Sequence, residues 1–254
     1  MSISVPTNTP MQREYQKWYS PNLQRDMELL VFGHAGKIVL FFPTRTARFY
    51  DYEDWGVINA LGPEIEAGQL QVICLDSADK ESFYNKELLP AERMKRHVLF
   101  EKYIIREVIP FVRQKNQHPY MVSAGCSLGA YHAVNIAFRH PQLFKKVVGM
   151  SGRYDVTISL PFFEDLLEGH MDELVFWHQP TRYLKDLHKN EQMHRIIKKM
   201  EIIIAVGKED AFLENNLLLD SILTEQSVNH IFQLWKGEAH KAQYWSQMVR
   251  MYFL

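Results

Sequence analysis

The chain has 254 residues, of which 46% are of hydrophobic type, so it is long enough to bury a sizeable core. Its 29 Lys and Arg residues balance 30 Asp and Glu residues, and the formal net charge of -1 argues against a nucleic-acid or anionic-membrane partner. The two cysteines, Cys74 and Cys126, stand in apolar stretches, which favours buried free thiols in a reducing compartment over a disulfide framework.

The opening residues are polar and rich in Pro and Thr, so we predict a flexible N-terminus over residues 1–12. They hold no basic segment followed by an apolar run, which predicts the absence of a signal peptide and a cytoplasmic location. The apolar runs are also far too short to span a bilayer, and we expect no membrane partner.

The first predicted elements are two strands, 13–19 and 26–32, which alternate partly in polarity and flank a Pro-Asn pair. Such a pattern is typical of an antiparallel hairpin. Continuous apolar runs follow along the chain and predict strands that are buried on both faces. These runs are 38–42, 70–76, 120–124, 145–152, 201–207 and 230–237.

Helical periodicity lies between these strands. In residues 92–114 the apolar side chains form one stripe, and Pro110 removes the hydrogen bond to the carbonyl of Arg106, which predicts a kink or break. The alternation of strands and helices predicts an α/β fold with a mostly parallel central sheet, an antiparallel edge hairpin and helices on both faces. The predicted helices are 53–67, 92–114, 128–139, 211–226 and 242–252.

Residues 153–200 do not fit this series, because their aromatic residues and prolines follow no regular spacing. We predict a single domain over residues 13–254, in which 153–200 is an insertion between two core strands. The insertion is either a cap over a site or a helical side layer with its own small core, and the sequence leaves both open.

The most informative motif is Gly125-Cys126-Ser127-Leu128-Gly129. The pattern Gly-x-Ser-x-Gly is weak alone, but an apolar strand before it and a helix after it are the context of a nucleophilic serine. The strained turn requires small neighbours, and the two glycines supply them. The helix N-terminus brings N–H groups and partial positive charge to Ser127, so the N–H of Leu128 is a predicted oxyanion donor. Cys126 is expected to point away and pack.

A serine nucleophile needs a base, and in this fold class the chain order is Ser, an acid and then His at successive strand ends. Glu209 and Asp210 follow the predicted strand 201–207, and His240 follows the next strand. Taken singly, Asp210 is better explained as the N-cap of a helix beginning at Ala211, and His240 as a surface histidine near a helix start. Together the three placements favour a triad of Ser127, Asp210 and His240, with Asp210 preferred over Glu209.

These stretches resemble the esterase-D-like branch of the α/β-hydrolases, the putative esterase family. The family includes S-formylglutathione hydrolase, feruloyl and acetylxylan esterases, and mycolyltransferases. The resemblance covers most of the chain from about Tyr15 onward, and it implies the α/β-hydrolase fold and the same triad. The matching segments are YSPNLQRDMELLVFG, KIVLFFP, ESFYNK, HVLFEKYIIREVIPFV, GCSLGAYHAVNIAFRHPQLFKKVVGMSGRYD, VGKEDAF and GEAHKAQYW.

The resemblance also implies that a second oxyanion N–H comes from the loop after strand 38–42. Many relatives have glycines in that loop, whereas this chain has Thr46-Ala47. The expected donor is the backbone of Thr44, Arg45 or Thr46.

Further site residues are weaker predictions. Arg45 and Arg48 either bind an acidic substrate group or pair with the acidic residues 51–54. By analogy with the family, a short segment and a histidine line the acyl or alcohol pocket, with packing as the alternative. The substrate-binding candidates are Arg48, Ser82, Phe83, Tyr84 and His97.

The function that these features favour is a serine carboxylesterase that hydrolyses small or medium carboxylic esters through an acyl-enzyme. It needs no metal or organic cofactor, and no His or Cys cluster has metal-ligand spacing. Two alternatives stay open. One is an acyltransferase that uses the same triad, and the other is a non-catalytic binding protein on a hydrolase scaffold. The sequence indicates neither the substrate nor the oligomeric state.

Overall fold

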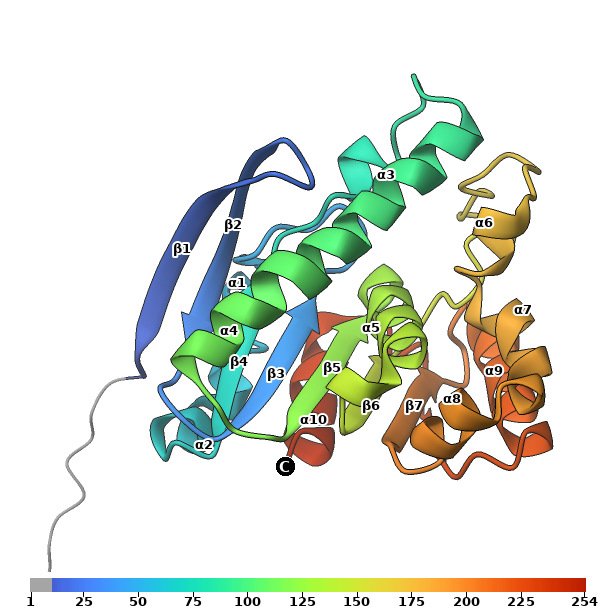
Figure 1. The fold of residues 1–254 in the computed structure, drawn as a ribbon. Coiled ribbons are helices and arrows are strands. Elements are labelled where there is room, and N and C mark those ends of the chain that lie inside the picture. The colour runs from blue at the N-terminus through green and yellow to red at the C-terminus, as the bar shows by residue number, and fades with distance from the viewer. Residues whose placement is uncertain (1–10) are drawn as a thin grey trace, which may run out of the picture.

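The computed structural model describes residues 11–254, so most of the predicted flexible segment 1–12 lies outside the described residues. Eight strands form one sheet in the order β1-β2-β4-β3-β5-β6-β7-β8 (Figure 1). The two pairings of β2 are antiparallel and all other pairings are parallel, which confirms the mostly parallel sheet with an antiparallel edge hairpin. The strands are β1 Arg13–Ser20, β2 Arg25–Phe32, β3 Lys37–Phe42, β4 Leu70–Leu75, β5 Met121–Cys126, β6 Lys146–Met150, β7 Glu201–Gly207 and β8 Ile231–Trp235.

Helices cover both faces of the sheet, and each face has its own large hydrophobic cluster. No helix of residues 11–254 is long and apolar enough to cross a membrane. One face carries α3 Pro90–Tyr103, α4 Ile109–Lys115, α5 Leu128–Arg139, α7 Pro180–Tyr183, α8 Glu191–Ile197 and α9 Leu213–Glu225. The other face carries α1 Asp51–Asp54, α2 Gly62–Glu66 and α10 Ala242–Tyr252.

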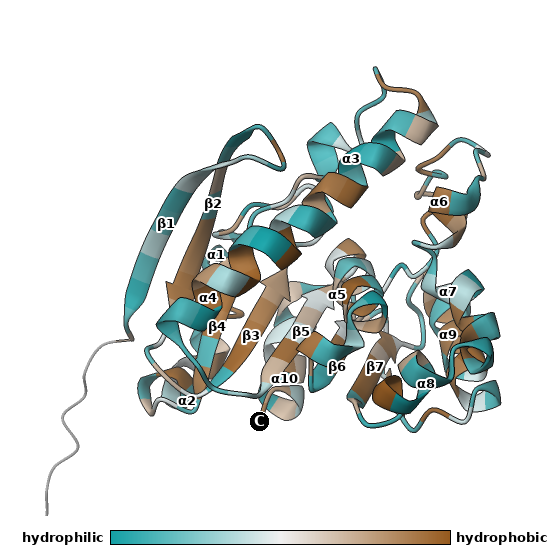
Figure 2. Cartoon of the chain, viewed as in Figure 1, coloured by the Kyte–Doolittle hydropathy of each residue, from teal (hydrophilic) through white to brown (hydrophobic). Residues whose placement is uncertain are grey.

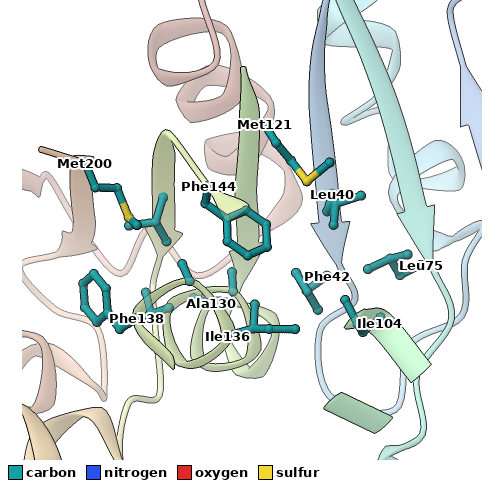
Figure 3. Packing of buried hydrophobic residues seen from close by; sticks show 14 of the residues in the cluster. Leu40, Phe42, Leu75, Ile104, Met121, Ala130, Ile136, Phe138, Phe144 and Met200 are labelled. Carbon is teal, nitrogen blue, oxygen red and sulfur yellow. The ribbon is translucent and has the colours of Figure 1, made fainter. Parts of the chain in front are cut away.

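Helix α5 lies in the middle of the first face and packs directly on the central strands. Figure 3 shows Ala130 and Ile136 of α5 in the cluster that includes Leu40 and Phe42 of β3. Figure 2 shows β3 as largely hydrophobic and β1 as largely hydrophilic, in keeping with a strand buried on both faces and an edge strand. Small residues on α5 let it approach the sheet closely, and the hydroxyl of Ser123 donates to the carbonyl of Ala133 over 2.9 Å.

The predicted disturbance at Pro110 takes a specific form. The helix does not break, because a π-helical turn, Ile104–Val108, connects α3 to α4. Pro110 then stands in the first turn of α4, where its missing N–H needs no helical partner. The π-helical turn therefore accommodates the hydrogen bond that Pro110 cannot donate.

The prediction of one helix over 53–67 is wrong. Helix α1 ends at Asp54. Gly56 follows with a φ of +73°, and a right-handed helix cannot continue through that conformation. A short 3-10 turn, Asn59–Leu61, leads to α2, which starts with Gly62 and has Pro63 in its first turn. The apolar periodicity continued across both glycines, although the backbone changes direction there.

Residues 153–200 are divided between two clusters. The earlier part joins a small cluster over the start of α5, whereas the later part packs into the main core of that face. Helix α6, Glu173–Phe176, belongs to the earlier part, as its buried Val175 shows. The later part thus has no small core of its own, and a cap formed by the earlier part stays a prediction.

Candidate active site

Ser127 occupies a sharp turn between the end of β5 and the start of α5. Its φ of 58° and ψ of -121° lie in a region that residues with a side chain rarely adopt, so the backbone is strained there. Hydrogen bonds hold the turn on both sides: the N–H of Ser127 donates to Met150 at 2.9 Å, and its carbonyl accepts from the N–H of Arg153 at 3.3 Å. The turn presents the serine at the carboxyl end of the sheet.

The glycines of the motif are required by close backbone contacts. A Cβ on Gly125 would lie 2.1 Å from the carbonyl oxygen of Gly129, and one on Gly129 would lie 2.3 Å from that of Phe42. Both distances are far below a van der Waals contact. The motif therefore packs the start of α5 against the ends of β3 and β5.

Cys126 points into the opposite side of the turn. It is fully buried in the cluster with α1 and α10, and its N–H donates to the hydroxyl of Tyr52 at 3.1 Å. Burial raises the pKa of the Cys126 thiol, which keeps it protonated. Among the described residues the two cysteines are free and buried, as predicted.

Asp210 and His240 meet after β7 and β8. Nδ1 of His240 donates to Oδ2 of Asp210 over 3.0 Å, and Oδ1 of Asp210 accepts the N–H of Phe212 at 2.9 Å. The Asp210 side chain is fully buried, whereas Glu209 is exposed. Asp210 thus fixes the local turn and holds the imidazole. It is not the helix cap that the sequence also allowed, because α9 begins at Leu213 with Phe212 as its N-cap and no capping side chain.

The loop before His240 is held against the ends of β6 and β7. Ala239 adopts a φ of +54°, and its carbonyl accepts the hydroxyl of Ser151 at 3.1 Å. A Cβ on Gly207 would lie 2.1 Å from the carbonyl oxygen of Glu238, so the loop approaches β7 as closely as a glycine permits. These contacts fix the backbone from which the imidazole projects.

Ser127 and His240 line the same pocket, which has a volume of about 250 Å³. The structure therefore brings these two residues together with several other predicted ones. No group of three or more His, Cys, Asp or Glu side chains in residues 11–254 is arranged to hold a metal ion. The remaining lining residues are Thr44, Arg45, Tyr84, Leu128, Arg153, Phe163, Phe212 and Trp245.

The predicted oxyanion donors differ in what their N–H groups contact. Leu128 is the first residue of α5, so its N–H has no carbonyl partner within the helix. The N–H of Thr46 is already donated to Oδ2 of Asp79 at 3.1 Å. Thr44 and Arg45 therefore fit a second donor better than Thr46, and both line the pocket.

Four of the five substrate-binding candidates do not reach this pocket. Arg48 is paired with Asp76 at 2.8 Å and with Glu28 at 2.5 Å. Phe83 and His97 are buried behind the pocket, with ring centroids 4.7 Å apart. The buried Ser82 donates its hydroxyl to a backbone carbonyl and is likewise absent from the lining.

The sequence reasoning missed four lining residues: Arg153, Phe163, Phe212 and Trp245. Three of them had a positional signal. Arg153 follows β6 at the carboxyl end of the sheet, where ligands bind in open α/β sheets. Phe212 and Trp245 lie shortly after Asp210 and His240 along the chain, whereas Phe163 stands in the irregular segment and had no such signal.

Comparisons with known proteins concern the family and the fold of the chain. A family model described as "Putative esterase" matches residues 52–248. No curated protein sequence gives a significant match. Solved structures with under 20% sequence identity share the fold over almost the whole chain, as three examples show.

A ferulic acid esterase superposes with a TM-score of 0.75 at 14% identity, over 96% of this chain and 97% of its own. An S-formylglutathione hydrolase from Agrobacterium tumefaciens gives 0.73 at 15% identity, over 96% and 94%. Its counterpart from Staphylococcus aureus gives 0.71 at 19% identity, over 97% and 96%.

Proposed function

Because this chain belongs to the putative esterase family of carboxylic ester hydrolases, we propose that it is a serine carboxylesterase acting through Ser127, Asp210 and His240. The observation that carries the proposal is the shared pocket. A serine on a strained turn and a histidine bonded to a buried carboxylate line one hollow at the carboxyl end of the sheet. That is the arrangement a serine nucleophile needs.

In the proposed reaction, Nε2 of His240 takes the hydroxyl proton as Oγ of Ser127 attacks the ester carbonyl carbon. Asp210 holds the imidazole through Nδ1 and stabilises its cationic form. The N–H of Leu128, with a second N–H from Thr44 or Arg45, donates to the oxyanion.

The intermediate then collapses and the ester C–O bond breaks, while His240 returns its proton to the leaving alkoxide. Water enters, gives a proton to His240 and attacks the acyl-enzyme carbonyl. The second intermediate collapses, the bond between the acyl carbon and Oγ breaks, and His240 returns the proton to Oγ, which frees the acid and restores Ser127. These steps use only groups of this chain and water, so they need no metal or organic cofactor.

The size and walls of the pocket support small or medium substrates. A volume of about 250 Å³ holds a short acyl chain or one aromatic ring. Phe163, Phe212 and Trp245 give it apolar walls. Two of the superposed structures are named as a ferulic acid esterase and an S-formylglutathione hydrolase.

The test is hydrolysis of short p-nitrophenyl esters by the Ser127→Ala variant. We expect a loss of at least about 10³-fold in kcat, because the nucleophile is removed while the fold is kept. Labelling by a fluorophosphonate should be lost in parallel. Ser221→Ala is the matched control, since Ser221 is exposed on α9. Hydrolysis that persists in purified, folded Ser127→Ala would refute the assignment.

A further inference from the structure

Two arginines line the pocket beside Ser127 without an acidic partner. Within the described residues, neither Arg45 nor Arg153 has a carboxylate oxygen within 4.0 Å of its guanidinium. Arg153 is only 3% exposed, so its charge is largely removed from water. A buried cation without a counter-charge is costly unless other groups or a ligand stabilise it.

Backbone carbonyls satisfy only part of Arg153. One terminal nitrogen donates to the carbonyls of Val156, Ile158 and Glu164, which fixes the side chain in place. Its Nε is buried and has no hydrogen-bond partner. Burial lowers the pKa of Arg153, and the nearby Asp155 and Asp165 only partly oppose this.

The nearby acids are engaged elsewhere. Asp155 accepts the N–H and hydroxyl of Thr157, and Asp165 accepts two backbone N–H groups. Glu164 lines a neighbouring hollow, but its carboxylate is mostly exposed and lies 3.2 Å from Nζ of Lys86. None of these three carboxylates forms an ion pair with either arginine. Asp155 and Asp165 offset only part of the charge of Arg153.

Arg45 and Arg153 also line a second hollow of about 380 Å³ that shares its wall with the catalytic pocket. Tyr84 stands between them, with the Arg45 guanidinium 6.0 Å from its ring centre. Burial raises the pKa of Tyr84 to about 12, so its hydroxyl stays a donor at neutral pH. The shared wall thus offers donors and positive charge to one bound group.

We propose that this hollow, next to Ser127, binds a carboxylate of the substrate between Arg45 and Arg153, so that the preferred ester carries an anionic group. The inference rests on the proposed function, and it adds the substrate class. Guanidinium groups pair strongly with carboxylates, and desolvation at Arg153 strengthens that pairing. A neutral ester would leave the buried charge without a partner.

Two matched substrate pairs test the proposal. For the alcohol side, 4-acetoxybenzoate is compared with 4-acetoxybenzamide, and for the acyl side, monomethyl adipate with methyl adipamate. We expect kcat/KM to favour the anion by about tenfold or more in one of the pairs, because charge-assisted hydrogen bonds form only there. The preference should fall as salt rises from about 0.05 M to about 0.5 M, since exposed Arg45 is screened.

The variants are compared by the ratio of kcat/KM for the anionic and the neutral substrate, which normalises each enzyme against itself. Arg45→Gln should lower the ratio by about tenfold, because one cation is lost. Arg45 is exposed and holds no core contact, whereas substitution of Arg153 also disturbs three backbone carbonyls. Arg195→Gln, an exposed change of the same charge on α8, should leave the ratio unaltered.

The outcomes separate this proposal from the proposed function. Hydrolysis without preference for the anion in either pair, and a ratio unaltered in Arg45→Gln, would overturn the carboxylate site and leave the esterase standing. If no ester is hydrolysed, the proposed function fails, and calorimetric binding of 4-hydroxybenzoate and adipate decides the site. Binding that weakens in Arg45→Gln would support it, and absence of binding would overturn it.

Discussion

Asp79 connects the loop after β3 to the helix that begins at the serine turn. Its Oδ2 accepts the N–H of Thr46 at 3.1 Å, and its Oδ1 lies 2.9 Å from Nε2 of His132 on α5. Asp79 and His132 are both buried, so solvent does not loosen this connection. The two N–H groups that fit a second oxyanion donor, those of Thr44 and Arg45, directly precede the anchored residue.

We therefore predict that Asp79→Ala releases this loop and lowers kcat by about 10²-fold, with a much smaller change in KM. We expect kcat to change much more than KM because an oxyanion donor acts mainly in the transition state. Steady-state kinetics on a neutral p-nitrophenyl ester measure both constants. Asp79→Asn keeps an acceptor for the N–H of Thr46 and should recover part of the loss. Wild-type kcat in folded Asp79→Ala would show that the loop supplies no donor.

The bond between Asp210 and His240 predicts a large catalytic effect without loss of the fold. Asp210→Asn preserves the shape but favours the wrong tautomer of the imidazole, so kcat should fall by about 10³-fold or more. The exposed neighbour provides the control, and Glu209→Gln should retain activity. Wild-type kcat in folded Asp210→Asn would contradict the role of this bond.

The glycines of the serine turn give a prediction about stability and activity together. Gly125→Ala places a Cβ 2.1 Å from a backbone oxygen, so the turn must move. We expect a loss of about 1–3 kcal/mol in the free energy of unfolding, together with a drop in kcat. Gly62→Ala is the control, because its Cβ meets nothing within 4 Å and its φ is -49°. Denaturant unfolding and kinetics on both variants check this, and equal stability would contradict it.

Much of the fold could be predicted because buried strands are visible in the sequence as local apolar runs. The serine turn, Asp210 and His240 were predictable for a related reason, since each follows directly on a strand that the sequence marks. The break of 53–67 was not, because apolar spacing continues where Gly56 turns left-handed. Periodicity reports which side chains are apolar and is insensitive to a change in chain direction.

Contacts between distant segments account for what the sequence missed at the site. Thr46 and Asp79 are 33 residues apart, and no local pattern joins them. Arg48 could have paired with the adjacent acids, but its side chain reaches Asp76 and Glu28 instead. Which arginine faces the pocket is decided by packing, and sequence alone carries no such information.

The buried His97 leads to a prediction about how the stability of the protein depends on pH. Burial lowers the pKa of His97 well below its ordinary value, and the nearby His132 and His178 lower it further, while Glu101 opposes them. The unfolded chain takes up a proton near about pH 6.5, whereas the folded chain does not. Unfolding therefore becomes more favourable as the pH falls below that value, and this contribution to stability is fully present only above it.

We expect His97→Gln to flatten this dependence. Between about pH 7.5 and about pH 5.5, one such histidine lowers the free energy of unfolding by at most about 1.4 kcal/mol. Over the same pH range, the free energy of unfolding of the variant should fall less than that of the wild type, by up to this amount. Glutamine keeps a polar atom for the hydroxyl of Tyr131, which lies 3.3 Å from Nε2 of His97. Urea unfolding at several pH values measures the slope, with the exposed His34→Gln as control. Parallel slopes for wild type and His97→Gln would assign the acid sensitivity to other groups.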